Sequence, residues 1–383
     1  MTALCLAVAS VFPSRSREQS IAEIERLGGT VRTGIVGGQD NPLLDFVEEM
    51  TELRDQTILG NSAQPPEFVV RVDLKRSRAD GSTLELMQSF PRLRHLTLAE
   101  TRVADDGLRH LEGLDDLSEL DLRETDVTDA GLQHLAGLPG LRWLRLSGTA
   151  VTDAGLAHLA EFTELESLDL WAVEITDVGL RHLKGLSALN TLNLSRTGVT
   201  DSGMRHLSRL RSLRQLELAN TQVGDEGLRH FSGLLRLEIL NLRGTQISDT
   251  GLGRLADLTN LTFLSLPHNE ISDDGLQHLS GLTKLEVLDL LGNRGVVTDR
   301  GLKHLSSLKS LSRLYIVGPM NITDDGLKYL HGLTNLTRLQ LSVGDQGASD
   351  AGLRELQIAL GLENREEVTT PNGKSIRLEI ASQ

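Results

Sequence analysis

A leucine that returns every 24 residues is the feature of this sequence that most limits its fold. The period is strict over nine units, which begin at Leu93, Leu117, Leu141, Leu165, Leu189, Leu213, Leu237, Leu261 and Leu285. Two further units begin at Leu311 and Leu336, and a degenerate unit with Val69, Val72 and Leu74 precedes the first. A period of this length predicts an elongated stack in which each unit contacts only its neighbours.

Two shorter periods within each unit predict one strand and one short helix. In LRWLRL (141–146), alternation places Leu144 and Leu146 on the buried side of a strand. In GLQHLAGL (131–138), the leucines follow the spacing of a helix with one apolar face. Parallel strands lie about 4.8 Å apart whereas helices are about 10 Å wide, so the stack must curve with its strands on the concave side.

The pattern L-x-x-L-x-L, continued by T-D-x-G-L-x-H-L, resembles the leucine-rich repeat family from Val69 to about Leu362. It is similar to the V-T-D-x-G-L repeats of bacterial proteins and to the repeats of F-box adaptor proteins. The resemblance implies an α/β fold, a right-handed leucine-rich repeat solenoid (horseshoe) with a parallel concave β-sheet and convex short α-helices. It also implies a non-enzymatic scaffold that binds a protein or peptide on the concave face. The alternative is an adaptor or substrate-recognition subunit of a larger F-box-like, ubiquitin-ligase or signalling assembly.

The ninth position of each unit departs from the family pattern, which has asparagine or cysteine there. Threonine occupies it in six units, and asparagine in two: Thr101, Thr125, Thr149, Thr197, Thr221, Thr245, Asn269 and Asn293. A buried threonine hydroxyl can still satisfy backbone groups in the turn. We therefore expect a ladder of buried polar side chains along the solenoid.

The repeats divide the chain into four regions. Residues 1–20 hold the apolar run Ala3–Phe12, which is too short to span a membrane as a helix. Two interpretations of this run are open: a truncated signal or anchor, or the apolar start of a cytoplasmic protein. The second is favoured. Residues 21–68 are expected to form a helical cap, with one helix ending at Gly28-Gly29 and another over Asn41–Leu53. Residues 69–362 form the solenoid of about 12 units, and 363–383 a hairpin cap.

The stretch VTDAGLQHL (127–135) combines a threonine, an aspartate and a histidine, the residue types of hydrolytic and metal sites. Its aspartate recurs in all eleven full units, from Asp105 to Asp350, where each helix is expected to begin. There a hydroxyl caps free N–H groups and a carboxylate opposes the helix dipole. Gly131 is expected to let a neighbouring backbone approach closely. The sequence therefore predicts a helix start and no catalytic centre.

A histidine follows this motif in eight units: His110, His134, His158, His182, His206, His230, His278 and His304. A zinc-binding column is the functional alternative, but Arg254, Tyr329 and Glu355 occupy the same position in other units. The sequence also has no H-E-x-x-H, no G-x-S-x-G and no glycine-rich phosphate loop. We predict that the protein is not an enzyme and binds no metal or other cofactor; a metal-dependent enzyme using the histidine column is the remote alternative.

Positions 3, 5, 7 and 8 of L-x-x-L-x-L-x-x are expected on the concave face. Both tryptophans fall there, and arginine takes the place of lysine. Tryptophan and arginine dominate interface energies, so the predicted partner-binding residues are Trp143, Trp171, Arg145, Arg123, Asp121, Asp169, Arg196, Phe263 and Tyr315. For the charged residues the alternative is that neighbouring strands pair their own charges, with Asp121 and Asp169 beside Arg145. Lengthened loops in the last units, such as GNRGVVTD (292–299), form a second candidate rim.

The net charge of −14 limits the class of partner. Nucleic acid binding needs clustered cations, and an acidic solenoid would not bind an anionic membrane directly. The expected partner is therefore an unknown protein or peptide, and the chain is expected to be a monomer.

Overall fold

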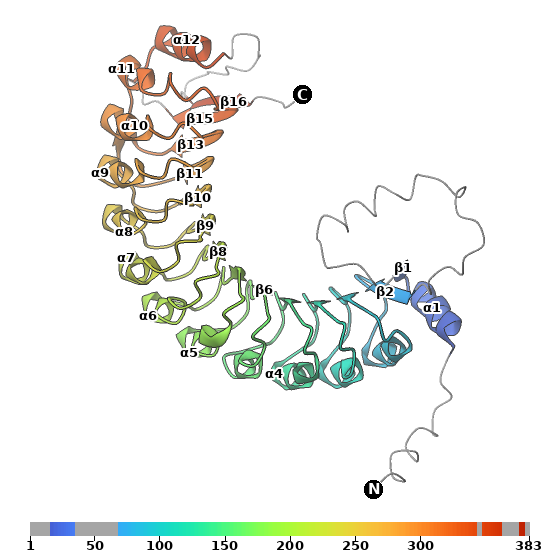
Figure 1. Ribbon diagram of the computed structural model, residues 1–383. Helices are drawn as coiled ribbons and strands as arrows, with labels where there is room; N and C mark the ends of the chain where they lie inside the picture. Colours follow the sequence, from blue (N-terminus) through green and yellow to red (C-terminus); the bar gives the residue numbers. More distant parts are fainter. Residues whose placement is uncertain (1–15, 35–67, 343–346, 362–374, 380–383) are drawn as a thin grey trace, which may run out of the picture.

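A computed structural model describes residues 16–34, 68–342, 347–361 and 375–379. These residues form an arc, with the strands on its inner side and the helices on its outer side (Figure 1). The predicted right-handed solenoid, with a parallel concave sheet and convex short helices, is confirmed.

One 14-stranded sheet lines the concave side. Its strands are β1 (Thr30–Gly34), β2 (Phe68–Asp73), β3 (His95–Thr97), β4 (Glu119–Asp121), β5 (Trp143–Arg145), β6 (Ser167–Asp169), β7 (Thr191–Asn193), β8 (Gln215–Glu217), β9 (Ile239–Asn241), β10 (Phe263–Ser265), β11 (Val287–Leu291), β13 (Arg313–Val317), β15 (Arg338–Ser342) and β16 (Ser375–Glu379). Neighbours from β2 to β15 pair in parallel, with Val72 beside Leu96 in the first pair and leucine beside leucine after it, as in Leu120, Leu144 and Leu168. This register arises because each unit repeats the same alternation one period later.

Short helices cover the convex side. Most α-helical pieces have four residues and several continue as a 3₁₀ turn, because a 24-residue unit leaves few residues between helix start and next strand. The α-helices are α1 (Arg17–Arg26), α3 (Asp105–Leu108), α4 (Asp129–Leu132), α5 (Asp177–Leu180), α6 (Asp201–Met204), α7 (Asp225–Leu228), α8 (Asp249–Gly253), α9 (Asp273–Leu276), α10 (Asp299–Leu305), α11 (Asp324–Lys328) and α12 (Asp350–Ala359). The 3₁₀ helices are η1 (Gly81–Ser89), η2 (Arg109–Leu111), η3 (Gln133–Gly137), η4 (Gly155–Leu159), η5 (Leu183–Gly185), η6 (Arg229–Phe231) and η7 (Gln277–Leu279). Within the described ranges, no helix has the length and apolar character needed to cross a membrane.

A continuous column of leucines fills the space between sheet and helices. In the unit that begins at Leu141, four leucines are fully buried: Leu144 in β5, Leu146 directly after it, and Leu156 and Leu159 on the convex side. Burial of one such side chain stabilises the fold by roughly 1.5–3 kcal/mol. Because every unit repeats this contribution, the core runs the length of the solenoid.

Antiparallel strands close both ends of the sheet. At the N-terminal end, α1 is followed by Gly28 with φ 93° and then by β1, which pairs with β2. The region expected as a helical cap thus also contains an edge strand that the sequence analysis did not predict. At the C-terminal end, β16 pairs with β15. The expected helix over Asn41–Leu53, the run Ala3–Phe12 and the first half of the expected hairpin lie outside the described residues.

In most units the aspartate at the start of the convex segment also accepts hydrogen bonds from the next unit. Asp129 accepts the N–H of Thr152 at 2.7 Å and the hydroxyl of the same threonine at 2.6 Å. Asp153 makes the equivalent pair of bonds to Thr176, at 2.7 and 2.6 Å. We call this pair of bonds the aspartate clasp. The sequence predicted only the helix start. The clasp could not be predicted, because the sequence of one unit does not show how close its aspartate lies to the next unit.

The glycine two residues after each clasp aspartate makes room for the clasp of the preceding unit. A Cβ on Gly179 would lie 2.5 Å from Asp153 Oδ1, and a Cβ on Gly131 would clash with Asp105 Oδ1. Gly131 was expected to admit a neighbouring backbone. The structure corrects this, because the closest group is the carboxylate.

Threonine and asparagine act differently at the ninth position. The Thr149 hydroxyl donates to the carbonyl of Leu146 at 2.6 Å, within its own unit. Asn269 also reaches the preceding unit, where its Nδ2 donates to Leu242 O at 2.7 Å and its Oδ1 accepts from Ile247 N–H at 2.9 Å. The threonines thus bond mainly within their own unit, although the Thr245 hydroxyl also donates to Asn269 Oδ1 at 3.0 Å. The aspartate clasp joins threonine and asparagine units alike.

Asn269→Thr should lower the free energy of unfolding by about 1–3 kcal/mol, because the buried N–H of Ile247 loses its acceptor. Urea denaturation followed by circular dichroism measures the change. Thr221→Val, which removes one local bond to Leu218 O, serves as the comparison and should cost about 1 kcal/mol. Equal losses in the two variants would contradict a role of Asn269 between units.

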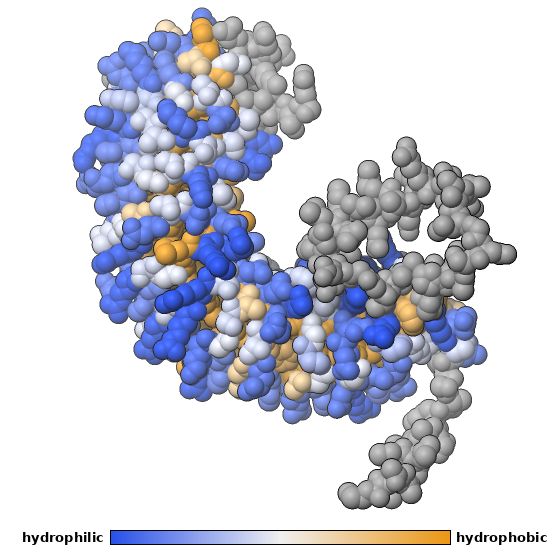
Figure 2. All heavy atoms as spheres, viewed as in Figure 1, coloured by the Kyte–Doolittle hydropathy of each residue, from blue (hydrophilic) through white to orange (hydrophobic). Residues whose placement is uncertain are grey.

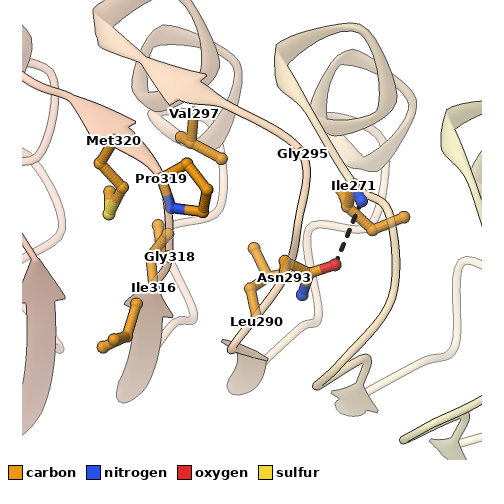
Figure 3. Close-up of a pocket in the computed structure, with 10 residues that line it drawn as sticks. Ile271, Leu290, Asn293, Gly295, Val297, Ile316, Gly318, Pro319 and Met320 are labelled. Atoms are coloured by element: carbon orange, nitrogen blue, oxygen red, sulfur yellow. Dashed lines mark hydrogen bonds between the residues drawn. The ribbon is translucent and has the colours of Figure 1, made fainter.

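The lengthened loops near the C-terminus pair to form a second small sheet. Its strands are β12 (Val297–Thr298) and β14 (Met320–Asn321). Figure 3 shows the adjoining loop, where Asn293 Oδ1 accepts the N–H of Ile271 at 3.1 Å. The cavity beside it is lined mainly by apolar side chains and has room for about one water molecule. This cavity is therefore too small for a ligand larger than a water molecule. Residues 343–346 of the last inserted loop lie outside the described part.

Candidate functional site

The concave face presents the side chains on either side of the buried position 4. In β5, Trp143 and Arg145 are half-buried and flank Leu144, which is fully buried. Position 7 differs from the expectation, because Ser147 and Ser195 are buried there. The chain turns away from the sheet at position 8, where φ is positive, so only large residues at position 7 reach solvent.

The two tryptophans lie in neighbouring units but not side by side. The strand register places Trp143 between Glu119 and Ser167. Trp171 comes four residues after Ser167, and four strand residues span about 13 Å. The two rings therefore mark two places on the face and do not form one pocket.

Trp171 and Arg196 form a stacked pair across two units. The guanidinium carbon of Arg196 lies 5.3 Å from the centroid of the Trp171 ring. Stacking on an indole holds the guanidinium by its face and leaves its N–H edge available to a carboxylate. Arg196 is exposed and forms no ion pair with any residue that the structure describes. The pair thus presents an apolar ring and an unneutralised charge together.

Other charged residues of the predicted site neutralise one another. Arg123 Nη2 lies 2.6 Å from Asp121 Oδ2, and the Asp121 side chain is only 2% exposed. Arg145 Nη1 lies 2.5 Å from Glu119 Oε1 and 3.8 Å from Asp121 Oδ2. Glu119 Oε2 is also hydrogen bonded to His95 Nδ1 at 3.0 Å. Intramolecular pairing therefore accounts for these charges, which form a hydrogen-bonded network beside Trp143.

Asp169 does not join this network in the expected way. It lies beside Arg145 in the strand register. Its Oδ1 instead accepts the backbone N–H of Trp171 at 3.1 Å. The carboxylate thus fixes the backbone at the tryptophan, and the alternative pairing of Asp169 with Arg145 is not formed.

Acid should weaken the network around Glu119. The hydrogen bond with His95, aided by the charge of Arg145, lowers the pKa of Glu119 from 4.5 to about 2. A lowered carboxyl pKa stabilises the fold while the group is ionised, so this contribution is complete above about pH 4.5 and is lost as the pH falls toward 2. It amounts to at most about 3 kcal/mol. Glu119→Gln should therefore lose less stability between about pH 6 and pH 3 than the wild type in urea denaturation. Glu164→Gln, an exposed control, should match the wild type, and equal losses in all three proteins would contradict the role of Glu119.

Phe263 and Tyr315 lie in the other half of the arc. Phe263 is half-buried and lies between Ile239 and Val287 in the register, which makes an apolar row. Tyr315 lies between Asp289, whose pKa burial raises, and Gln340. Six strand spacings separate β6 from β13 in the sheet order, or about 29 Å. Phe263, on β10, is four spacings from β6, or about 19 Å, so both aromatics lie well apart from Trp171 along the sheet.

Sequence reasoning missed His95 and Glu119. Both occupy position 3, in the two units before the one that carries Trp143. A comparison of position 3 with position 5 across neighbouring units would have placed Glu119 within reach of Arg145. The sequence analysis considered acids such as Asp121 and Asp169, but not the histidine and the glutamate at position 3.

The convex histidines contact arginines. Arg181 Nε donates to His182 Nε2 at 3.1 Å, and the arginines before His206 and His230 make similar contacts at 3.4 Å. Partial burial, followed by the charge of the adjacent arginine, lowers the pKa of all three histidines. In the described residues no group of three or more potential ligands is placed to hold a metal ion.

Two family models match parts of the chain. A model described as "Leucine rich repeat" matches residues 163–223, and another described as "Leucine Rich repeat" matches 116–136, 237–256 and 257–280. This chain has the leucine-rich repeat fold. A search of curated proteins gave no significant match to this leucine-rich repeat chain.

Solved leucine-rich repeat structures resemble the chain in fold. An internalin (inlF) from Listeria monocytogenes is 23% identical, with a TM-score of 0.58, over 78% of this chain and 88% of its own. Internalin C2 from the same organism is 30% identical over 54% of this chain and 81% of its own, with a TM-score of 0.44. The plant peptide hormone receptor RGFR1, solved in complex with RGF2, is 17% identical over 66% of this chain and 48% of its own, with a TM-score of 0.45. The first of these likenesses establishes the fold alone.

Proposed function

We propose that this protein is a non-enzymatic scaffold that binds a protein or peptide partner on its concave face, through Trp171, Arg196 and Trp143. The observation that carries the proposal is the stack of Arg196 on Trp171, because that arginine forms no ion pair with a described residue. An exposed cation–π pair becomes more stable when a partner covers it and excludes water. Tryptophan and arginine also dominate interface energies.

The surrounding structure favours a partner with an acidic and an apolar group. Arg196 supplies a fork for a carboxylate, and Trp143 offers a half-buried ring about four strand residues away along the face. The ion-pair network and the leucine core hold the strands beneath both rings. Binding to a rigid face costs less conformational entropy than binding that must first order the site.

Capture from a native lysate tests the proposal. The immobilised full chain is compared with a Trp143→Ala/Trp171→Ala variant, with bound proteins identified by mass spectrometry. We expect the variant to lose the captured partner, whereas Tyr329→Ala, on the exposed convex side, should retain it. Unchanged capture by the double variant would exclude this site.

An adaptor or substrate-recognition subunit is the alternative, and it rests on the resemblance of the repeats to those of F-box proteins. In that case the chain should capture a stoichiometric assembly of several subunits. Some of these subunits would remain bound to the double variant, because a docking surface for the assembly would lie away from the tryptophans.

A further inference from the structure

The convex side carries a cluster of cations that the concave site does not use. Its members are Arg181, Lys184, Arg205, Arg209 and Arg211, here called the basic patch, and all five are exposed. Residues 178–216 contain these five cations, Arg196 and Arg214, which lie outside the patch, and one aspartate, in a chain of net charge −14. This local excess of positive charge is therefore opposite in sign to the protein as a whole.

Stacking of units brings the patch together. Arg181 follows α5 and Arg205 follows α6, at the same repeat position one unit apart. The helices α5 and α6 contact each other, and Figure 1 shows them on the outer side of the arc. Lys184, Arg209 and Arg211 lie in the segments that lead from these helices to the next strands. In Figure 2 the outer edge of the arc is mostly hydrophilic.

The cations of the patch are not paired with neighbouring carboxylates. None of the five cations forms an ion pair with another residue in the described ranges; Arg181 and Arg205 donate to the adjacent histidines. The cations also act on His206: burial and then Arg205 lower its pKa, Asp177 opposes them, and Lys184 and Arg181 lower it further. Self-repulsion of this kind is relieved by an anionic partner.

Acidic side chains bound the patch on both sides. Glu161 and Glu164 lie in the preceding unit, and Glu226 in the following unit pairs with Arg229 at 3.0 Å. The basic surface is therefore about two units long, roughly 20 Å at about 10 Å for each helix. A nucleic acid or a membrane would also meet the flanking carboxylates, whereas a short acidic segment would not.

We propose that the basic patch binds a short, extended acidic segment of another protein, independently of the concave site. Arginine forks favour carboxylates, which they bind with two parallel hydrogen bonds. An extended chain advances about 3.3 Å per residue, so three residues match the roughly 10 Å between Arg181 and Arg205. A segment with aspartate or glutamate at every third residue fits this spacing.

Fluorescence anisotropy with the full chain tests the proposal. The probe is a fluorescein-labelled peptide of twelve residues with glutamate at every third position and glycine or serine elsewhere; a glutamine peptide is its control. We expect saturable binding that weakens with added salt and is lost with glutamine. Arg181→Gln/Arg205→Gln/Arg209→Gln should raise the Kd at least tenfold, since each exposed charge pair contributes modestly. Arg109→Gln is the control: Arg109 occupies the same repeat position as Arg181 and Arg205, but lies beside the acids Asp106 and Glu112. This variant should leave the Kd unchanged.

Three results would overturn the proposal. The first is no saturable binding of the glutamate peptide, and the second is an equal Kd for the triple variant and the wild type. The third is displacement of the peptide by phosphatidylserine vesicles or double-stranded DNA that bind more tightly through the same arginines, which would assign the patch to a polyanion. Melting curves of the variants should match that of the wild type, because the replaced side chains are exposed.

Discussion

Gly179→Ala is expected to lower the free energy of unfolding by about 3 kcal/mol or more. The added Cβ would lie 2.5 Å from Asp153 Oδ1 and 2.9 Å from Leu156 Cδ1, both closer than atoms approach without a shift. That carboxylate is fixed by Thr176 and by the Gly179 N–H at 3.0 Å, so it cannot yield without breaking the clasp. Overpacking costs typically 1–3 kcal/mol, and loss of hydrogen bonds to a charged group adds about 1.5–3 kcal/mol.

Urea denaturation compares Gly179→Ala with Gly281→Ala, where nothing lies within 4 Å of the added Cβ. Alanine in place of glycine restricts the unfolded chain, so the control should be neutral or more stable by about 0.4–1 kcal/mol. Equal midpoints for the two variants would contradict the steric role of Gly179.

A second substitution separates the clasp from general crowding. Asp153→Ala removes the carboxylate that the new methyl group meets, so the double variant with Gly179→Ala should lose less stability than the sum of the two single changes. Residues in contact commonly show such coupling of 0.5–3 kcal/mol. If the two losses of stability add, the strain arises from the contact between the new methyl group and Leu156 instead. Hydrogen exchange should show the lost protection centred on the units around α5, because each unit contacts only its neighbours.

The fold could be predicted from the sequence because one unit contains nearly all its determinants. The alternation in LRWLRL fixes which leucines face the core, and the constant period fixes the parallel register. The curvature follows from the different widths of strand and helix. Physical constraints that repeat eleven times leave little room for another arrangement.

The candidate site could be predicted only in part, because its geometry depends on contacts between units. The register separates Trp143 from Trp171, although the sequence places both at concave positions. Ser147 and Trp171 both occupy position 7, just before the turn at position 8. Ser147 is buried there, whereas the larger Trp171 stays half-exposed. The role of Asp153 as a clasp requires the position of the next unit, which no single repeat reveals. The edge strand β1 was missed because its residues carry no repeat signal.

Trp171→Ala should weaken partner binding by about thirtyfold or more, equivalent to about 2 kcal/mol, as expected for a central interface tryptophan. The loss has two sources: the ring's own contact and the support it gives Arg196 at 5.3 Å. A double-mutant cycle with Arg196→Ala should therefore show coupling of about 0.5–1 kcal/mol. The Kd values are measured on the captured partner by isothermal titration calorimetry. Stability should change little, because the ring is only half-buried.

The chain offers a direct optical assignment of the site, because its only two tryptophans both lie on the concave face. Trp143→Phe leaves Trp171 as the sole emitter, and Trp171→Phe leaves Trp143. Addition of the partner should shift or quench the emission of Trp171 most strongly, since a carboxylate that reaches Arg196 must approach that ring. If neither emission changes while Tyr315→Ala weakens binding, the partner occupies the other half of the arc, about 29 Å away. In that case the stacked pair of Trp171 and Arg196 would stabilise the solenoid and would not bind the partner.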